Sequence, residues 1–136
     1  MQRKPLLIAA ALIAAAFLIG YIPNELAARQ LATKLHGTEL ELRLATLQRQ
    51  LGVASHQAQR NNYGIASKIA EEFFAGCRKA LQDFRLRDRP RTRIALTEYA
   101  LQGDTVVGQL ANGDPQAKER LASMFLTLDG VIQRQQ

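Results

Sequence analysis

The sequence predicts an all-α protein in which an N-terminal transmembrane helix precedes a small antiparallel helical bundle with coiled-coil-like heptads. Three observations predict this class. The run from Leu6 to Ile22 carries no charge, the apolar residues after Pro23 recur at intervals of three and four, and no stretch alternates with the period of two that marks a β-strand. With 136 residues, 47% of them hydrophobic, the chain has room for one such domain and an appendage.

The uncharged run at residues 6–22 follows Arg3 and Lys4. At about 1.5 Å per helical residue it covers roughly 26 Å, which suits a bilayer core when flanking residues lie in the interface. We therefore expect residues 1–22 to form a cytoplasmic tail and an uncleaved signal anchor. A cleaved signal peptide is one alternative, although no clear A-x-A-like cleavage site appears between Gly20 and Ala28. A buried helix of a soluble fold is the other.

The basic residues around this run predict its orientation. The positive charge is concentrated directly before the run, at Arg3 and Lys4, and is more widely spaced after it, at Arg29 and Lys34. The more positive side stays in the cytoplasm. We therefore expect a single-pass protein of the bacterial inner (cytoplasmic) membrane. Its N-terminus would be cytoplasmic and residues 23–136 would be periplasmic or otherwise extracytoplasmic.

Small residues four apart in the expected span could let two such helices approach closely. The candidates are Ala10 with Ala14, and Ala16 with Gly20. An Ala-rich segment also produces this spacing by chance, so self-association through the span is one of two interpretations.

Residues 23–60 are expected to form a juxtamembrane helical or coiled-coil segment. Asn24 can cap a short helix that ends near Gly37, and Thr38 with Glu41 forms a capping box that opens a second helix. The apolar stripes on the two sides of residues 36–38 are out of phase by two residues, so either the helix breaks there or its apolar face rotates. The apolar stripe of the second helix is Leu40, Leu44, Leu47, Leu51, Ala54 and Ala58. The leucines of this stripe are candidates for a helix–helix contact, within the chain or with a partner.

Residues 61–136 are expected to form a helical bundle into which residues 38–60 pack. A turn at residues 61–64 should fold the next helix back, although one long helix through it remains an alternative. The expected stripe of that helix is Ala66, Ala70, Phe73, Cys77, Ala80 and Phe84. A third helix from about Pro90 should present Leu96, Ala100, Gly103, Val107 and Leu110. After a sharp turn at residues 112–115, the last helix should bury Ala117, Leu121, Met124, Phe125, Leu128 and Ile132.

The usual linear signatures of catalysis are missing from the sequence. His36 and His56 are isolated, without an HExxH or Glu-x-x-His pattern. Glu71 and Glu72 are adjacent and so point in different directions around a helix. We therefore expect no enzyme, no cofactor, no metal site and no small-molecule substrate.

The single cysteine, Cys77, shares a stripe with Phe73 and is expected in the core. The alternatives are a reactive thiol beside Arg78 and an intermolecular disulfide.

The positive charge is concentrated in one part of the chain. Residues 78–93 hold seven Lys or Arg against two acids, in a chain of net charge +6. The linker at residues 85–93 supplies the candidate contacts with an anionic partner, namely Arg85, Arg87, Arg89, Arg91 and Arg93. Such a patch attracts anionic lipids, acidic proteins or polyanions, and a merely solvated loop is the plain alternative. Because no aromatic residues are interleaved for base stacking, no nucleic-acid partner is expected.

Two functions are compatible with these features. The first is a membrane-anchored interaction or scaffold protein that acts on the extracytoplasmic side through protein–protein contacts or self-association. In outline this is similar to the small single-span coiled-coil proteins of bacterial envelope and division complexes, a likeness of architecture that implies no functional residue. The second is a membrane-tethered module that binds anionic lipids or polyanions through residues 85–93.

Overall fold

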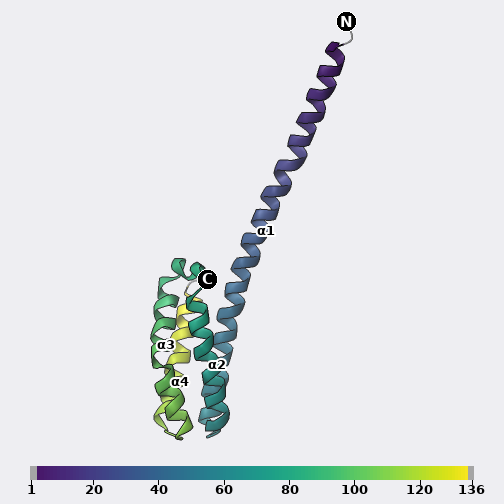
Figure 1. The fold of residues 1–136 in the computed structure, drawn as a ribbon. Helices are drawn as coiled ribbons and strands as arrows, with labels where there is room; N and C mark the ends of the chain where they lie inside the picture. Colours follow the sequence, from purple (N-terminus) through teal and green to yellow (C-terminus); the bar gives the residue numbers. More distant parts are fainter. Residues whose placement is uncertain (1–2, 135–136) are drawn as a thin grey trace. The chain divides into compact units, whose positions relative to one another are not determined.

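The computed structural model describes the backbone of residues 3–134 and the side chains of residues 29–32, 34, 35 and 37–134. This part of the chain is helical, with four α-helices, one 3-10 helix and no strand (Figure 1). The elements are α1 (Arg3–Gln59), α2 (Tyr63–Leu81), η1 (Phe84–Asp88), α3 (Pro90–Ala111) and α4 (Gln116–Gln133). The prediction of an all-α helical bundle is confirmed.

The chain divides into two compact units, Met1–Glu39 and Leu40–Gln136. The second unit holds the last part of α1 and all later elements, and its successive helices are antiparallel (Figure 1). Lys118 Nζ donates to Asn61 Oδ1, so α4 begins beside the turn that follows α1. The Tyr99 hydroxyl donates to the Met124 carbonyl at 2.9 Å and links α3 to α4.

Within the residues whose side chains the structure describes, no helix is both long enough and apolar enough to cross a membrane. The span expected at residues 6–22, with its small-residue pairs Ala10 and Ala14, and Ala16 and Gly20, lies outside those side chains.

Helix α1 continues where the sequence predicted a boundary. Asn24 and residues 36–38 are all within this one helix. The Thr38 hydroxyl donates to the Lys34 carbonyl at 2.9 Å, the bond a hydroxyl makes inside a helix and not at its start. One Gly at position 37 costs about 1 kcal/mol of helix propensity, which does not by itself end a helix. The predicted break and the capping box are wrong.

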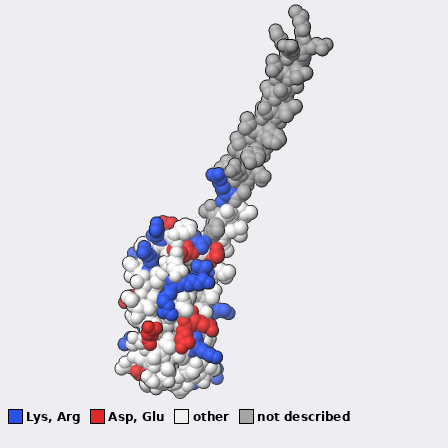
Figure 2. Space-filling view, viewed as in Figure 1, with Lys and Arg blue, Asp and Glu red and all other residues white. Residues whose placement is uncertain are grey.

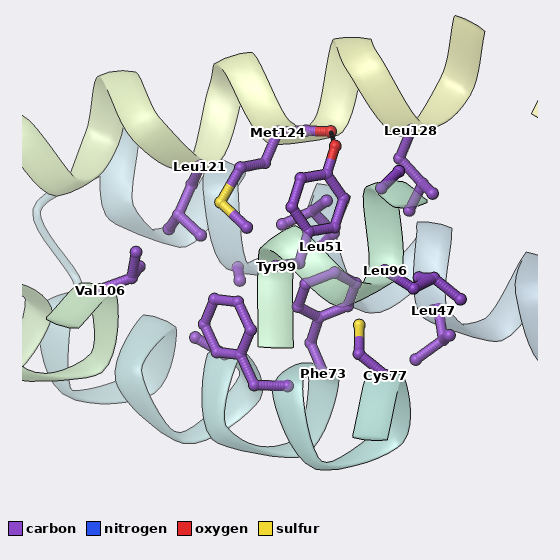
Figure 3. Packing of buried hydrophobic residues seen from close by; sticks show 14 of the residues in the cluster. Leu47, Leu51, Phe73, Cys77, Leu96, Tyr99, Val106, Leu121, Met124 and Leu128 are labelled. Carbon is purple, nitrogen blue, oxygen red and sulfur yellow. Dashed lines mark hydrogen bonds between the residues drawn. The ribbon is translucent and has the colours of Figure 1, made fainter. Parts of the chain in front are cut away.

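The apolar stripes of the helices meet in one core. Its buried members from α1 are Leu40, Leu44, Leu47, Leu51, Ala54 and Ala58, as predicted. Those from α2 are Ala66, Ala70, Phe73, Phe74, Cys77 and Ala80. Those from α4 are Ala117, Leu121, Met124 and Leu128, with Phe125 and Ile132 packed against them at the edge. Figure 3 shows the ring of Phe73 and the sulfur of Cys77 pointing into this core.

Two expectations about the core are wrong. Phe84 continues the stripe of α2 only if the helix continues, but α2 ends at Leu81, and 74% of the Phe84 surface is exposed. In α3 the buried residues are Thr92, Ala95, Leu96, Tyr99, Gly103, Val106 and Leu110. Ala100, expected inside, is only half-buried, whereas Val107 packs against the edge of the core as Phe125 and Ile132 do. The inward face is rotated because Tyr99 lies inside, where its hydroxyl bonds a backbone carbonyl of α4 (Figure 3).

Two turns at the same end of this unit share a backbone motif. Asn61 (φ 63°) and Gly113 (φ 67°) adopt left-handed conformations just after α1 and α3. The N–H of the following residue donates in each case to the carbonyl five residues earlier, at 2.9 Å, which is the Schellman arrangement. The Asp114 carboxylate then accepts from the Gln116 N–H at 2.9 Å and caps α4. Both turns that the sequence predicted are confirmed.

Two glycines lie where helices pack closely. A β-carbon on Gly76 would lie 2.6 Å from Leu47 Cδ2, and one on Gly103 would lie 2.9 Å from Phe74 Cγ. The Leu47 methyl is the far end of a flexible side chain, whereas Phe74 Cγ is the root of a ring that packs edge-on against Phe73, with centroids 5.1 Å apart. Gly103 therefore sets how closely α2 and α3 approach.

We predict that Gly103→Ala lowers the free energy of unfolding, because displacing the Phe74 ring costs about 1–3 kcal/mol, more than the gain in helix propensity. Gly108→Ala in the same helix is the matched control: its β-carbon would meet nothing within 4 Å, so it should stabilise by about 0.5–1 kcal/mol. Urea unfolding of the full chain in mild detergent, followed by circular dichroism, measures both. Equal stabilisation by the two substitutions would contradict the assigned packing.

Candidate functional site

The candidate site is built on the arginine segment (residues 85–93), which comprises most of η1 and the first turn of α3. Its conformation begins with a cap. The Asp83 side chain accepts a hydrogen bond from the Arg85 backbone N–H at 3.0 Å and so starts the 3-10 helix. Leu86 of η1 is fully buried in the core and holds the segment against the bundle. The predicted linker is therefore an ordered, anchored turn.

Asp83 is the centre of a charge cluster that joins η1 to α1. Arg85 Nε donates to Asp83 Oδ1 at 2.8 Å, and Arg85 Nη2 donates to Oδ2 at 2.6 Å. The Arg43 guanidinium of α1 lies 3.7 Å from the same carboxylate. The hydrogen bonds from Arg85, with the nearby charge of Arg43, lower the pKa of Asp83 to about 2. The carboxylate is thus ionised in the folded protein at neutral pH.

A second ion pair joins the arginine segment to α1. Arg89 Nη2 donates to Glu41 Oε1 at 3.1 Å. Of the five predicted contact residues, Arg85 and Arg89 therefore bond to carboxylates of the same chain. The side chains of Arg87, Arg91 and Arg93 are exposed to solvent.

The leucines proposed for a helix–helix contact lie within the core of the second unit. Leu40, Leu44, Leu47 and Leu51 are all buried against other helices of the same chain. Of the two contacts considered for these leucines, the structure shows the one within the chain.

Cys77 is also in the core, and the prediction that it packs there is confirmed. Its side chain is fully buried. Burial raises the pKa of the Cys77 thiol to about 12, and the charge of Arg78 offsets only part of that rise. Because the thiolate is the reactive form, this cysteine is inert at neutral pH in the folded protein.

A groove on the outward side of α3 is a feature that sequence reasoning missed. It has a volume of about 630 Å³ and is lined by Arg87, Pro90, Arg93, Ile94, Thr97, Glu98 and Leu101. We call it the α3 groove. Its large apolar residues are open to solvent: 66% of the Ile94 surface and 80% of the Leu101 surface are exposed.

The sequence does hold a signal for the α3 groove. Ile94 and Leu101 are seven residues apart, so they share one helical face, and that face is opposite the buried stripe that contains Leu96 and Gly103. Two large apolar residues outside the inward stripe of a helix indicate a second apolar face.

The charges of the α3 groove are unevenly distributed. Arg87 and Arg93 lie toward the start of α3, and Glu98 lies one turn further along. An apolar floor beside two guanidinium groups can hold an apolar side chain together with a neighbouring carboxylate. Among the described residues, no group of three or more His, Cys, Asp or Glu could hold a metal ion.

Compared with protein-family models, with curated proteins and with solved structures, the chain shows no match in any of the three comparisons.

We predict that the Asp83 cluster makes stability depend on pH in the acid range. Because folding lowers the pKa of Asp83 to about 2, its stabilising effect is present above the pKa of the unfolded carboxyl, about 3.9, and is lost as the pH falls toward about 2. Asp83→Asn should therefore melt below the unsubstituted chain at about pH 6 and together with it at about pH 2. Asp104→Asn, on an exposed turn of α3, controls for the loss of one negative charge. A gap between the Asp83 variant and the unsubstituted chain that is independent of pH would contradict the assignment.

Proposed function

We propose that this protein is a single-pass, membrane-anchored helical scaffold whose bundle binds a partner protein through the α3 groove on the extracytoplasmic side of a bacterial inner membrane. The observation that carries this proposal is the exposure of Ile94 and Leu101 on one face of α3, beside Arg87 and Arg93. In this proposal the anchor determines the location of the protein, and the groove determines which partner it binds.

The anchor is supported by the sequence of residues 6–22. This run has no charge and is preceded by Arg3 and Lys4. Its many Leu, Ile and Phe residues each favour insertion by about 0.3–0.6 kcal/mol at central positions, which gives a few kcal/mol in total. Basic residues directly before the run favour a cytoplasmic N-terminus.

Partner binding is supported by the cost of leaving the apolar face of α3 in water. Burying a Leu or Ile side chain contributes about 1.5–3 kcal/mol, and a pair on one helical face can accept the apolar face of another helix. Ile94 and Leu101 lie two helical turns apart on α3, a spacing that matches two side chains on one face of such a helix. The groove therefore fits a helical segment better than an extended strand, which binds through backbone hydrogen bonds at a sheet edge.

The charges of the α3 groove specify the chemistry of that segment. Arg87 and Arg93 favour carboxylates at one end of the bound helix, whereas Glu98 disfavours a continuous acidic face along it. The partner is thus an amphipathic helix with two apolar side chains about two turns apart and an Asp or Glu near one end.

The proposed topology predicts the outcome of reporter fusions. A reporter that is active only in the periplasm, fused after Gln136, should be active in a Gram-negative host, because residues 23–136 are proposed to lie on that side. The same reporter fused before residue 6 should be inactive. Activity of a cytoplasm-restricted reporter at the C-terminal fusion would reverse the orientation.

The groove predicts a site-specific crosslink. A photoreactive phenylalanine analogue at position 101 of the full chain should crosslink one partner protein, whereas the same analogue at Leu126 should not, although that residue of α4 is also exposed. Leu101→Ser should abolish co-purification of the same partner in mild detergent. The complex should persist when the ionic strength is raised, since its main contact is apolar.

A charge exchange identifies the bound segment. Arg93→Glu should weaken binding at least about tenfold, the usual cost of opposing like charges at close range in an interface. Exchanging an acidic residue of the partner helix for Lys should restore it. A crosslinked protein without an acidic amphipathic helix, or a failure of the exchange to restore binding, would contradict the proposal.

A further inference from the structure

We infer that one end of the bundle, the basic end, docks on a bilayer surface rich in anionic lipid headgroups. The basic end is defined by six exposed side chains from three helices and η1, namely Arg78, Lys79, Arg87, Arg91, Arg93 and Arg134. The inference goes beyond the proposed partner site, and its geometry rests on the anchor proposed above.

Tertiary structure brings these side chains to one end. Arg78 and Lys79 are in the last turn of α2, Arg91 is in the first turn of α3, and α4 returns antiparallel to α3 to end at Arg134. Several Lys and Arg side chains gather around this end of the described unit in Figure 2. The fold therefore adds the charges of Arg78, Lys79 and Arg134 to those of the arginine segment.

The carboxylates at this end do not cancel its charge. Asp83 is paired with Arg85 and lies near Arg43, and Glu41 is paired with Arg89. These pairs are nearly neutral as groups, and they hold the turn in place. The exposed acids near the six basic side chains are Asp88 of the same turn and Glu98, which lines the α3 groove with Arg87 and Arg93, so positive charge is still in excess.

An exposed aromatic residue accompanies this charge. Phe84, the first residue of η1, has 74% of its surface in solvent, whereas Leu86 of the same turn is buried in the core. Basic side chains with an exposed aromatic ring are the combination that binds the interface of an anionic bilayer, because the cations attract the headgroups and the ring enters the acyl boundary.

The position of the basic end also favours a bilayer. Glu41, which bonds Arg89, lies at the start of the second compact unit, so the arginine segment is at the end of that unit where its chain begins. An anchor at residues 6–22 would keep the unit at high local concentration near a membrane surface. A free acidic protein or a second copy would have no such advantage.

The experiment places an environment-sensitive fluorophore beside the arginine segment. The full chain with Cys77→Ala and Gln82→Cys is labelled and reconstituted into lipid nanodiscs of phosphatidylcholine, alone or with about one third phosphatidylglycerol. We expect blue-shifted emission in the anionic discs only, and loss of the shift when added salt screens the charges. A label at Gln59, at the opposite end of the bundle, should show no shift in either disc.

Matched variants assign the effect to the basic end. Replacing Arg78, Lys79, Arg91 and Arg134 by Gln should weaken the anionic response at least about tenfold, whereas replacing Arg49, Arg60, Lys68 and Arg120 by Gln removes the same charge elsewhere and should leave it in place. None of the first four lines the α3 groove, so partner binding should survive these changes.

Three outcomes would overturn the inference. They are the absence of a shift in anionic discs, an equal shift in neutral discs, which would indicate contact with a second copy, and an equal loss in both sets of variants. The proposed anchor is judged separately, because a chain without it would fail to co-elute with the neutral discs.

Discussion

The close approach of α2 and α3 at Gly103 is the constraint on which the described unit depends. With no β-carbon there, the ring of Phe74 lies directly on the backbone of α3, and the Phe73 ring packs against it and, at 6.2 Å between centroids, near Tyr99. This contact fixes the rotation of α3. The rotation turns Tyr99 inward to bond α4, and it turns Ile94 and Leu101 outward into solvent. Core packing and the α3 groove thus have one cause.

Charge in this protein has two separate uses. Arg43, Arg85 and Arg89 meet carboxylates of the same chain and order the turn between α2 and α3. Such pairs contribute little to stability where they are exposed. The Asp83 cluster contributes more to stability, because only 5% of the Asp83 side chain is exposed. The remaining arginines of the segment are displayed because their neighbours hold the backbone. An ordered turn presents charge at lower entropic cost than a mobile loop with the same composition.

The α3 groove and the basic end are adjacent surfaces that would bind through different interactions. The groove offers apolar area, whose contribution to binding persists at high ionic strength, and the basic end offers charge, whose contribution falls over a Debye length of about 8–10 Å. A scaffold that is oriented by its charged end on a membrane would present its apolar face sideways to a partner. The two proposals are therefore compatible, and each involves residues that the other does not require.

The sequence by itself determined the helices, the two turns at Asn61 and Gly113, and most of the buried stripes, because helical periodicity and left-handed capping residues are local properties. It also located the arginine segment. Only tertiary structure decided the rest. It decided that Phe84 lies outside, because α2 ends before it. It decided which arginines are paired, since Glu41 is far from Arg89 in sequence. Finally, it opened the α3 groove, because a helix has an outward face only once its neighbours fix the inward one.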